Sequence, residues 1–463
     1  EIGVRLVGSE MCIRDSMFSG CTSNPDVTHF DMSQATTINH MFNGCLIFDQ
    51  NLSDWNVSNV TNMESLFVNC RLFNSDISGW IVSNVTNMAN LFQNAWLFNY
   101  NINSWDVSNV TNMERTFAGA REYNQPLNNW DVSNVTNMKA MFTGTEFNQN
   151  INNWNTGNVT DMSYMFESMN FFNQPIGNWD TSKVTNMEWM FRRCNAFNQD
   201  ISGWDVGEVT TMEYMFVQAI SFNQDFGSWN AGKVTNMQYM FNGAINFNGY
   251  IDGWDVSSVT NMEFMFYQTP FNQPLNSWNV GNVTNMRWMF QGTPFNQPIG
   301  NWNVSKVSNF YLTFDGTPFN QDIGGWDTSN LGNAERMLSN TPFNQDISGW
   351  DMSKAFSTKQ MFENCTDFNG RVDNWDLSNV TTMSAMFSGA TSFNQDVGGW
   401  TLTKVTNTAS MFRNATSFNQ DISGWDMSTV SVASYMFSGA TSFNQDIGNW
   451  NTSNFTNIEH MFS

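Results

Sequence analysis

The chain has 463 residues, including 41 Phe, 31 Met and 20 Trp, and only 13% of its residues are charged. This apolar mass can supply a continuous core and excludes a disordered chain. The formal net charge of −23 excludes nucleic acids and anionic membranes as partners, because an acidic surface repels both. No apolar run approaches the roughly 18 residues that span a bilayer, and no signal peptide is recognisable.

The chain opens with residues 1–16, which share no pattern with the rest. We interpret this non-repeat leader as linker or library-derived sequence that takes no part in the fold. Residues 17–463 carry one repeating pattern, so we predict a single repeat solenoid over that range. The pattern starts and stops in mid-unit without a polar cap, so we expect a fragment that is uncapped at both ends.

Tryptophan marks the period of the repeat. It recurs at a nearly constant interval from Trp55 to Trp450, and Phe30 holds the same place in the first turn. This gives about eighteen turns with the consensus F-N-Q-D-I-S-G-W-D-V-S-N-V-T-N-M-x-x-M-F-x-G-A-T-S. One turn cannot bury its own inner face, so neighbouring turns must stack.

Two spacings predict the local structure of each turn. W-D-V, as in residues 105–107, alternates inward and outward like a short strand. M-x-x-M-F, as in residues 187–191, places its apolar side chains on one face of a helical turn. Thr185 suits an N-cap before it, and a glycine such as Gly243 suits a C-cap after it. We therefore predict an α/β repeat solenoid with one short parallel β-strand and one short helical turn per repeat.

The motifs at residues 418–426 (F-N-Q-D-I-S-G-W-D) and 105–113 (W-D-V-S-N-V-T-N-M) are clean instances of a known repeat. The pattern resembles the BspA-like leucine-rich-repeat surface proteins, and in particular a 25-residue domain of unknown function found in mycoplasma lipoproteins. The resemblance covers about residues 17 to 463. It implies a leucine-rich-repeat-like solenoid, a cell-surface or secreted location, and a role in adhesion or protein binding. It carries over no catalytic residue.

The residue after the repeated Phe is the most uniform position, and it is almost always Asn. A buried side chain beside the core would be costly to leave unsatisfied, so we predict a structural asparagine ladder that bonds the turn backbone. The alternative is a ladder of ligands. The ladder comprises Asn74, Asn99, Asn124, Asn198, Asn223, Asn419 and Asn444.

The residue after the Trp is mostly Asp or Asn and is expected to point outward from the strand. Stacked turns would align these side chains about 5 Å apart. Such a ladder is either a solvated face or a binding face for calcium, a cationic ligand, a protein or a glycan. A flat ladder does not provide the six to eight oxygens that calcium prefers, so we predict no cofactor, with calcium as the alternative. The candidate binding face comprises Asp106, Asp131, Asp180, Asp205, Asp255, Asp327, Asp376 and Asp426.

Residues that could support catalysis or metal binding are sparse. Five cysteines share one column with Ala and Thr, which predicts a small buried side chain, although a bridge between Cys45 and Cys70 is the alternative. The three histidines are His29, His40 and His460, and they form no zinc spacing and no Ser-His-Asp or Cys-His set. We therefore predict that the protein is not an enzyme.

These inferences predict an extracellular or cell-surface binding scaffold that mediates adhesion or protein–protein interaction. Its partner would be an extracellular protein or a glycan, without nucleic acid binding and without direct membrane insertion. Two alternatives remain. The chain could be a structural spacer or stalk, or the regular Thr column that includes Thr86 and Thr111 could bind an ice or mineral surface.

Overall fold

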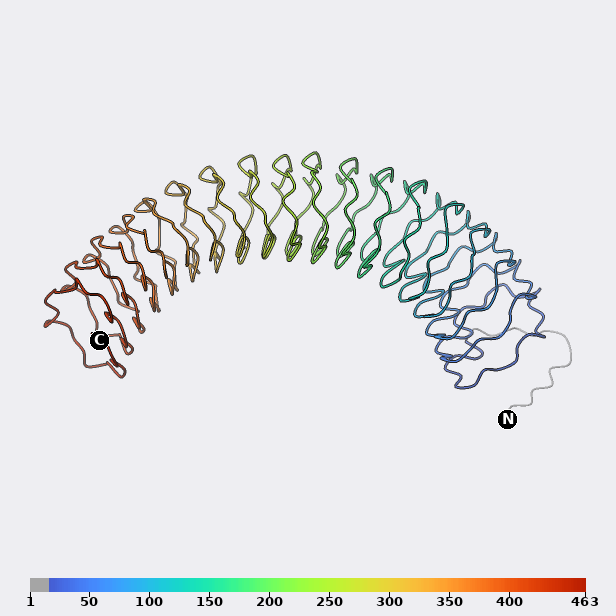
Figure 1. Cartoon of the computed structure of the whole chain (residues 1–463), viewed down its shortest axis with the longest axis horizontal. Coiled ribbons are helices and arrows are strands. Elements are labelled where there is room, and N and C mark those ends of the chain that lie inside the picture. Colours follow the sequence, from blue (N-terminus) through green and yellow to red (C-terminus); the bar gives the residue numbers. More distant parts are fainter. Residues whose placement is uncertain (1–15) are drawn as a thin grey trace. The chain divides into compact units, whose positions relative to one another are not determined.

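The computed structural model describes residues 16–463 and divides into two compact units. Unit 1 comprises Glu1–Val209 and Met215–Phe222, and unit 2 comprises Thr210–Tyr214 and Asn223–Ser463. Within each unit, successive turns stack in sequence order (Figure 1). The predicted leader lies outside the described residues except for Ser16, and the prediction of one domain over 17–463 stays a prediction.

Neighbouring turns form their β-bridges at another position than the predicted W-D-V strand. Residues 16–463 contain no helix and no extended strand, only isolated parallel bridges at the Asn of V-T-N-M, such as Asn87 with Asn112. The W-D-V segment forms no bridge in these residues. The backbone N–H of Trp105 instead donates to the carbonyl of Ile102 (3.1 Å), which closes a local turn. The repeat solenoid therefore forms without the predicted strand, because these peptide groups bond within their own turn.

The predicted helical turn is also replaced by another path. The second x of M-x-x-M has a positive φ in turn after turn, for example +57° at Asn90 and +59° at Tyr239. The N–H of Leu91 donates to the carbonyl of Met88 (3.2 Å), whereas the N–H of Asn90 reaches Glu114 in the next turn (2.7 Å). This is a β-turn with a left-handed third residue rather than an α-helix. Its Met and Phe side chains are buried as predicted, because the spacing suits both paths.

Three columns of stacked aromatic rings fill the core. The ring centroids of Phe92 and Phe98 lie 3.9 Å apart within one turn, and those of Phe67 and Phe92 lie 5.8 Å apart between turns. Trp80 and Trp105 stack at 6.2 Å. All of these side chains are buried. The interior is therefore continuous from one turn to the next, as the repeat predicts.

Side chains of the uniform columns bond the backbone of the adjacent turn. The Trp105 indole N–H donates to the carbonyl of Ile77 in the preceding turn (3.1 Å). Asn109 Nδ2 donates to the carbonyl of Ser83 (2.8 Å), and the Thr86 hydroxyl donates to the carbonyl of Thr61 (3.2 Å). The Thr predicted to cap a helix thus joins two turns instead. These side chains fulfil much of the role that a β-ladder has in a wider sheet.

The asparagines after the repeated Phe follow the same principle. The backbone N–H of Asn99 donates to Oδ1 of Asn74 (3.1 Å), and the N–H of Asn444 donates to Oδ1 of Asn419 (2.9 Å). Nε2 of Gln420 adds a bond to Oδ1 of Asn394 (2.9 Å). The burial expected for this ladder is not found. Its predicted members are exposed, except for the half-buried Asn99, because the bonds run along the surface edge of the turns: Asn74, Asn99, Asn124, Asn198, Asn223, Asn419 and Asn444.

The residues with positive φ allow a test of the backbone conformation within each turn. Gln268 has a φ of +55°, and the same column holds Gly243 and Gly292 in the adjacent turns. Left-handed backbone costs an L-residue about 1–2 kcal/mol, whereas the entropy lost on introducing Gly costs roughly 0.5–1 kcal/mol. We expect Gln268→Gly to raise the free energy of unfolding by up to about 1 kcal/mol, measured by urea denaturation.

The matched control is Asn242→Gly, one position before Gly243. Asn242 is not among the residues with positive φ, so only the entropy loss applies. We expect this control to lose roughly 0.5–1 kcal/mol. Equal destabilisation by both substitutions would contradict the left-handed conformation at Gln268.

Candidate variable face

Two positions in each turn carry side chains that do not belong to a uniform column. They are the two residues between the paired Met positions, and their identity changes from turn to turn. In unit 2 they include residues 213–214, 238–239, 263–264, 287–288 and 311–312, which we call the variable face. Residues of the uniform columns pack in the core or bond the adjacent turn. Sequence differences that could confer specificity therefore concentrate at the two variable positions.

The second position of the variable face carries a run of aromatic side chains. Ring centroids lie 4.6 Å apart between Tyr214 and Tyr239, 4.6 Å between Tyr239 and Phe264, and 5.1 Å between Phe264 and Trp288. The interplanar angles are 5°, 15° and 12°, so the rings are stacked. All four are half-buried, which leaves part of each ring accessible. We call Tyr214, Tyr239, Phe264 and Trp288 the aromatic ladder.

At its Trp288 end, the aromatic ladder is followed by edge-on ring contacts. The Tyr311 ring meets the Trp288 ring at 5.6 Å with an interplanar angle of 72°. Tyr267 lies edge-on to Phe264 (5.3 Å) and to Trp288 (5.7 Å). At the next turn the ladder position is Leu312, which is buried. The aromatic run of unit 2 therefore ends at Trp288, and in unit 1 the same column holds Tyr164 and Trp189, whose rings stack at 5.4 Å.

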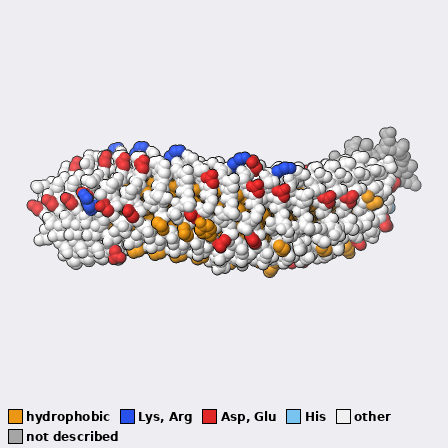
Figure 2. All heavy atoms as spheres, turned by 90° about the horizontal axis from the view of Figure 1, so that it is seen from above, with side chains coloured by type: hydrophobic (Ala, Val, Ile, Leu, Met, Phe, Trp, Pro, Cys, Tyr) orange, Lys and Arg blue, Asp and Glu red, His pale blue; other side chains and the backbone are white. Residues whose placement is uncertain are grey.

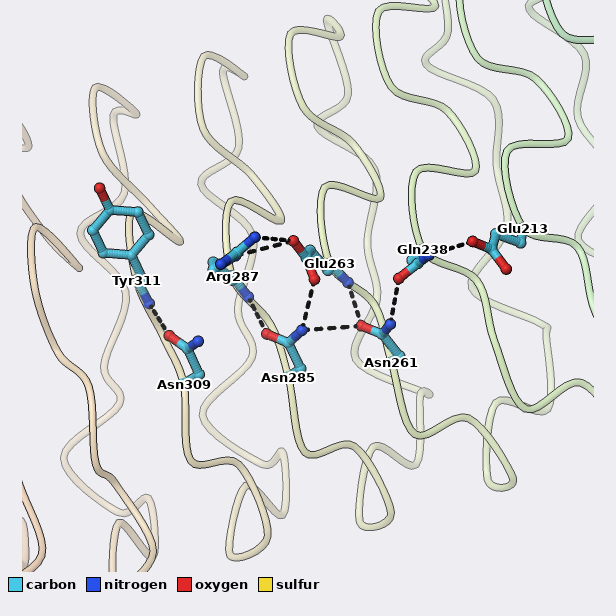
Figure 3. A network of polar contacts seen from close by, with 8 residues as sticks. All are labelled: Glu213, Gln238, Asn261, Glu263, Asn285, Arg287, Asn309 and Tyr311. Carbon is cyan, nitrogen blue, oxygen red and sulfur yellow. Dashed lines mark hydrogen bonds and ion pairs between the residues drawn. The ribbon is translucent and has the colours of Figure 1, made fainter.

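A polar network runs beside the aromatic ladder on the same turns (Figure 3). Asn285 Nδ2 donates to Oε2 of Glu263 (2.9 Å), and Arg287 Nε donates to Oε1 of the same carboxylate (3.0 Å). Asn261 Nδ2 donates to Oε1 of Gln238 (2.6 Å), and Gln238 in turn bonds Glu213. These bonds link four successive turns. They hold the charged side chains in fixed positions next to the rings.

Burial, and secondarily the Glu263 carboxylate, raise the pKa of Tyr239, while Arg287 opposes that shift. The Tyr239 hydroxyl therefore stays protonated through the physiological pH range and can act as a hydrogen-bond donor. The ladder thus offers both apolar ring area and polar groups.

Sequence analysis missed this face, although a signal was present. Tyr214, Tyr239, Phe264 and Trp288 recur once per turn in a column that holds Ser65, Ala140 or Ser410 elsewhere. The predicted helical turn places this column on its outer surface, where variation is expected. On the face that Figure 2 shows, white polar side chains and backbone cover most of the surface, and apolar side chains gather in separate patches.

The predicted carboxylate face has a different local geometry. All eight of its side chains are exposed, and each Oδ1 accepts a hydrogen bond from the backbone N–H two residues ahead. The Asp131 bond to Ser133 measures 3.0 Å. Such bonds are Asx turns, which stabilise the bend after W-D-V. The members are Asp106, Asp131, Asp180, Asp205, Asp255, Asp327, Asp376 and Asp426. As a binding face they stay a prediction.

The Asx turns predict a pH dependence of stability. Hydrogen bonds from the hydroxyl and the backbone N–H of Ser133 lower the pKa of Asp131, and equivalent serines lower those of Asp180 and Asp255. A folded pKa below the unfolded value of about 3.9 stabilises the fold above that pH. This stabilisation is lost as the pH falls through the folded pKa. We expect the wild type to lose thermal stability between pH 5 and pH 3.

The matched variant is Asp131→Asn, Asp180→Asn and Asp255→Asn combined. An Asn can accept the same N–H, as Asn155 does from Gly157 (3.2 Å), but it does not titrate. We expect the triple variant to lose less thermal stability over this pH range than the wild type. Identical pH profiles would show that these carboxylates do not contribute.

No group of three or more His, Cys, Asp and Glu side chains that could hold a metal ion occurs in residues 16–463. Cys45 and Cys70 are buried and free, so the alternative of a bridge between them is not found. Burial raises the pKa of the Cys365 thiol to about 11. Cys194 and Cys365 are also buried, as the small-residue column predicts. Among the described residues there is also no helix that could cross a bilayer.

The stacked turns and their side-chain ladders define a repeat solenoid protein. A family model matches seven overlapping segments that together run from residue 13 to residue 463: 13–128, 77–174, 114–229, 168–270, 216–318, 268–372 and 357–463. The chain therefore belongs to the family described as "Mycoplasma protein of unknown function, DUF285". This confirms the predicted repeat family. No curated protein matches the sequence.

Two solved structures show distant similarity. A leucine-rich cell surface protein from Faecalibacterium prausnitzii is 11% identical, with coverage of 89% of this chain and 76% of that chain and a TM-score of 0.27. A leucine-rich-repeat protein from Bacteroides ovatus is 9% identical, with coverage of 90% and 87% and a TM-score of 0.21. Superposition at this level carries no information about what this chain binds.

Proposed function

We propose that the protein is a cell-surface or secreted binding scaffold that holds an extracellular protein on its variable face. The observation that supports this function is the aromatic ladder: Tyr214, Tyr239, Phe264 and Trp288 stacked at 4.6–5.1 Å and half-exposed. The core is complete without these rings, since the Phe and Trp columns already fill it. Half-exposed aromatics outside the core are a recognised feature of interaction sites.

The composition of the patch favours a protein partner. Tyr, Trp and Arg are the residues enriched at binding hot spots, and the variable face combines aromatic rings with Arg287. Arg287 is held by Glu263, so a partner meets a pre-organised guanidinium. Glu263 is neutralised by Arg287, so Glu213 leaves these three side chains with a net negative charge, which suits a partner with basic groups around an apolar centre.

Other readings of the surface receive less support. The carboxylate face, including Asp106, remains a second candidate, but one oxygen of each carboxylate is engaged in its own turn. The Thr column donates its hydroxyls to backbone carbonyls and is interrupted by Gly332 and Phe356, which does not favour an ice or mineral surface. A spacer without a partner would leave the aromatic ladder unexplained. A catalytic role finds no support, and the expectation of a non-enzyme stays a prediction.

The test measures retention of labelled extracellular proteins on the immobilised chain. We expect specific retention by the wild type and its loss in the variant Tyr239→Ser with Phe264→Ser. The matched control is Asp131→Lys with Asp180→Lys, which alters the carboxylate face instead. We expect the control to retain the partner. Footprinting of the complex should then protect Tyr214 and Trp288.

Two outcomes would contradict the proposal. Retention by the aromatic variant but not by the control would move the binding site to the carboxylate face. Absence of specific retention by the wild type would favour the spacer function. Addition of a chelator tests the calcium alternative in the same experiment, because loss of retention would require a bound cation.

A further inference from the structure

A second feature of the surface lies in unit 1 and does not involve the aromatic ladder. It is a groove of about 520 Å³ across four successive turns. Its lining includes the three cations Arg115, Arg121 and Lys139, and the one acidic side chain Glu167. The formal charge of this lining is therefore 3 − 1 = +2, whereas the whole chain carries −23. The groove lining is thus positively charged, whereas the chain as a whole is negatively charged.

Two of these cations are not neutralised within the protein. Arg115 pairs with Glu114, and Glu167 pairs with Arg192 (2.7 Å) outside the groove lining. In the part of the chain that the structure describes, Arg121 and Lys139 form no ion pair with a carboxylate. The two cations lack an ion pair although the sequence contains 41 acidic residues. Both charges are free to meet an anion from solution.

Both of these cations lie over aromatic rings. The Arg121 guanidinium carbon is 4.2 Å from the Trp96 ring centroid, and Arg71 lies on the other side of Trp96 at the same distance. Lys139 Nζ lies 5.9 Å from the Tyr164 ring centroid. Cation–π contacts orient these side chains and leave their N–H groups available as donors. The cations are thus positioned without being neutralised.

Small residues form the floor of the groove. Ala118 and Ala140 occupy positions that hold Arg192 and Trp189 in later turns, whereas Gly119 and Gly144 are the glycine of the repeat consensus. A Cβ added at Gly144 would meet nothing within 4 Å, so the space above it is open. Gln93 and Thr143 add polar groups to the lining. The hollow therefore forms where the two alanines coincide with the consensus glycines.

We propose that this groove binds an anionic saccharide, a polysaccharide segment that bears carboxylate or sulfate groups. Arg121 and Lys139 supply charge-assisted hydrogen bonds to the acidic group. The half-buried Tyr164 ring adds apolar area beside Lys139, and the amide and hydroxyl groups of Gln93 and Thr143 match sugar hydroxyls. The volume falls within the range of small-ligand sites.

The backbone argues against an acidic peptide as the ligand. An extended peptide needs unpaired backbone N–H and carbonyl groups along the edge it joins. At the floor of this groove the N–H of Gly119 already donates to Thr143 (2.7 Å) and that of Gly144 to Glu167 (2.9 Å). A peptide main chain would therefore lack these partners, whereas a saccharide can bond the side chains.

The test is calorimetric titration of the full chain with oligogalacturonate, dextran sulfate, neutral dextran and poly-L-glutamate. We expect oligogalacturonate or dextran sulfate to bind, with an affinity that falls as salt is added. The tighter of the two identifies the anionic group. Neutral dextran should not bind, and poly-L-glutamate should bind at least about tenfold more weakly.

The variant Arg121→Gln with Lys139→Gln should weaken the saccharide by about tenfold or more. Lys306→Gln removes an exposed Lys charge in unit 2, where Nζ bonds Asn282 (2.6 Å), and should leave affinity unchanged. Thermal unfolding verifies that each variant is folded. The variant Tyr239→Ser with Phe264→Ser should keep saccharide binding, which separates this site from the proposed protein-binding face.

Three results would overturn the proposal. One is absence of binding by both anionic saccharides. Another is unchanged affinity in the folded Arg121 and Lys139 variant, or an equal loss in Lys306→Gln. The third is binding of neutral dextran or poly-L-glutamate as tightly as the anionic saccharide. Tight binding of neutral dextran would show that the groove does not recognise the charge, and tight binding of poly-L-glutamate would show that it does not recognise the sugar.

Discussion

Trp254→Ala is expected to lower the free energy of unfolding by about 3–5 kcal/mol, which is the usual cost of deleting a buried large aromatic side chain. Trp254 is 2% exposed, and its ring stacks on Trp229 at 5.9 Å and on Trp278 at 6.3 Å. Its indole N–H also donates to the carbonyl of Phe226 (2.9 Å). The substitution would therefore open a cavity, interrupt a ring column and remove one of the two hydrogen bonds that the Phe226 carbonyl accepts, the other coming from the backbone N–H of Trp229 (3.2 Å).

Urea denaturation of the full chain, followed by circular dichroism, measures this loss. Trp254→Phe is the informative companion, because it keeps an aromatic ring but removes the indole N–H. We expect it to cost less than the alanine variant, with about 0.5–1.5 kcal/mol from the lost hydrogen bond to the Phe226 carbonyl. Hydrogen exchange should show the largest change in the turns next to Trp254, since solenoid turns contact only their neighbours. A Trp254→Ala variant as stable as the wild type would contradict the stacked Trp column.

Tyr123→Phe is expected to raise the free energy of unfolding by about 1–3 kcal/mol. Tyr123 is fully buried between Phe98 (5.7 Å) and Phe147 (6.3 Å), in a column that otherwise holds Phe. In the part of the chain that the structure describes, its buried hydroxyl has no hydrogen-bond partner. Phe removes the unsatisfied hydroxyl while keeping the ring and its stacking. Burial also raises the pKa of Tyr123 well above its usual value, so the native side chain stays neutral.

Thermal and urea unfolding measure the gain. Tyr267→Phe is the matched control, because the Tyr267 hydroxyl accepts a hydrogen bond from Gln268 Nε2 (3.1 Å) and the side chain is half-buried. We expect the control to change stability by no more than about 0.5 kcal/mol. A loss of stability in Tyr123→Phe would mean that the hydroxyl is satisfied in the folded protein.

Together the two substitutions separate the two requirements of the core. Trp254 tests whether a side chain that both stacks and bonds the adjacent turn is needed. Tyr123 tests whether a polar group that only stacks is harmful. Trp254 belongs to a column that holds Trp from residue 55 to residue 450, so its result applies to that column, whereas Tyr123 tests a single exception in a column of Phe.

The candidate surfaces depended less on the repeat than on its exceptions. The aromatic ladder lies where Tyr239 and Phe264 replace small or polar residues, and the groove in unit 1 lies where Ala118 and Ala140 replace larger ones. Column variation was visible in the sequence. Only the three-dimensional structure shows which variable positions lie side by side on the surface and which cations form no ion pair.

The sequence by itself determined the period, the stacking of turns and the identity of the buried columns. Trp105, Phe98 and Phe92 could be assigned to the core because burial follows from apolar residues that recur in register. A turn that cannot bury its own face has no other stable arrangement. The same reasoning yielded the family resemblance.

Only the tertiary structure decided the path of the backbone within a turn. The spacing of Met88, Leu91 and Phe92 is satisfied equally by a helical turn and by a left-handed β-turn. The choice depends on where the N–H of Asn90 finds its acceptor. That acceptor is the carbonyl of Glu114 in the following turn, at a distance of 2.7 Å. A hydrogen bond of this kind exists only once the neighbouring turn is in place, so no local pattern could reveal it.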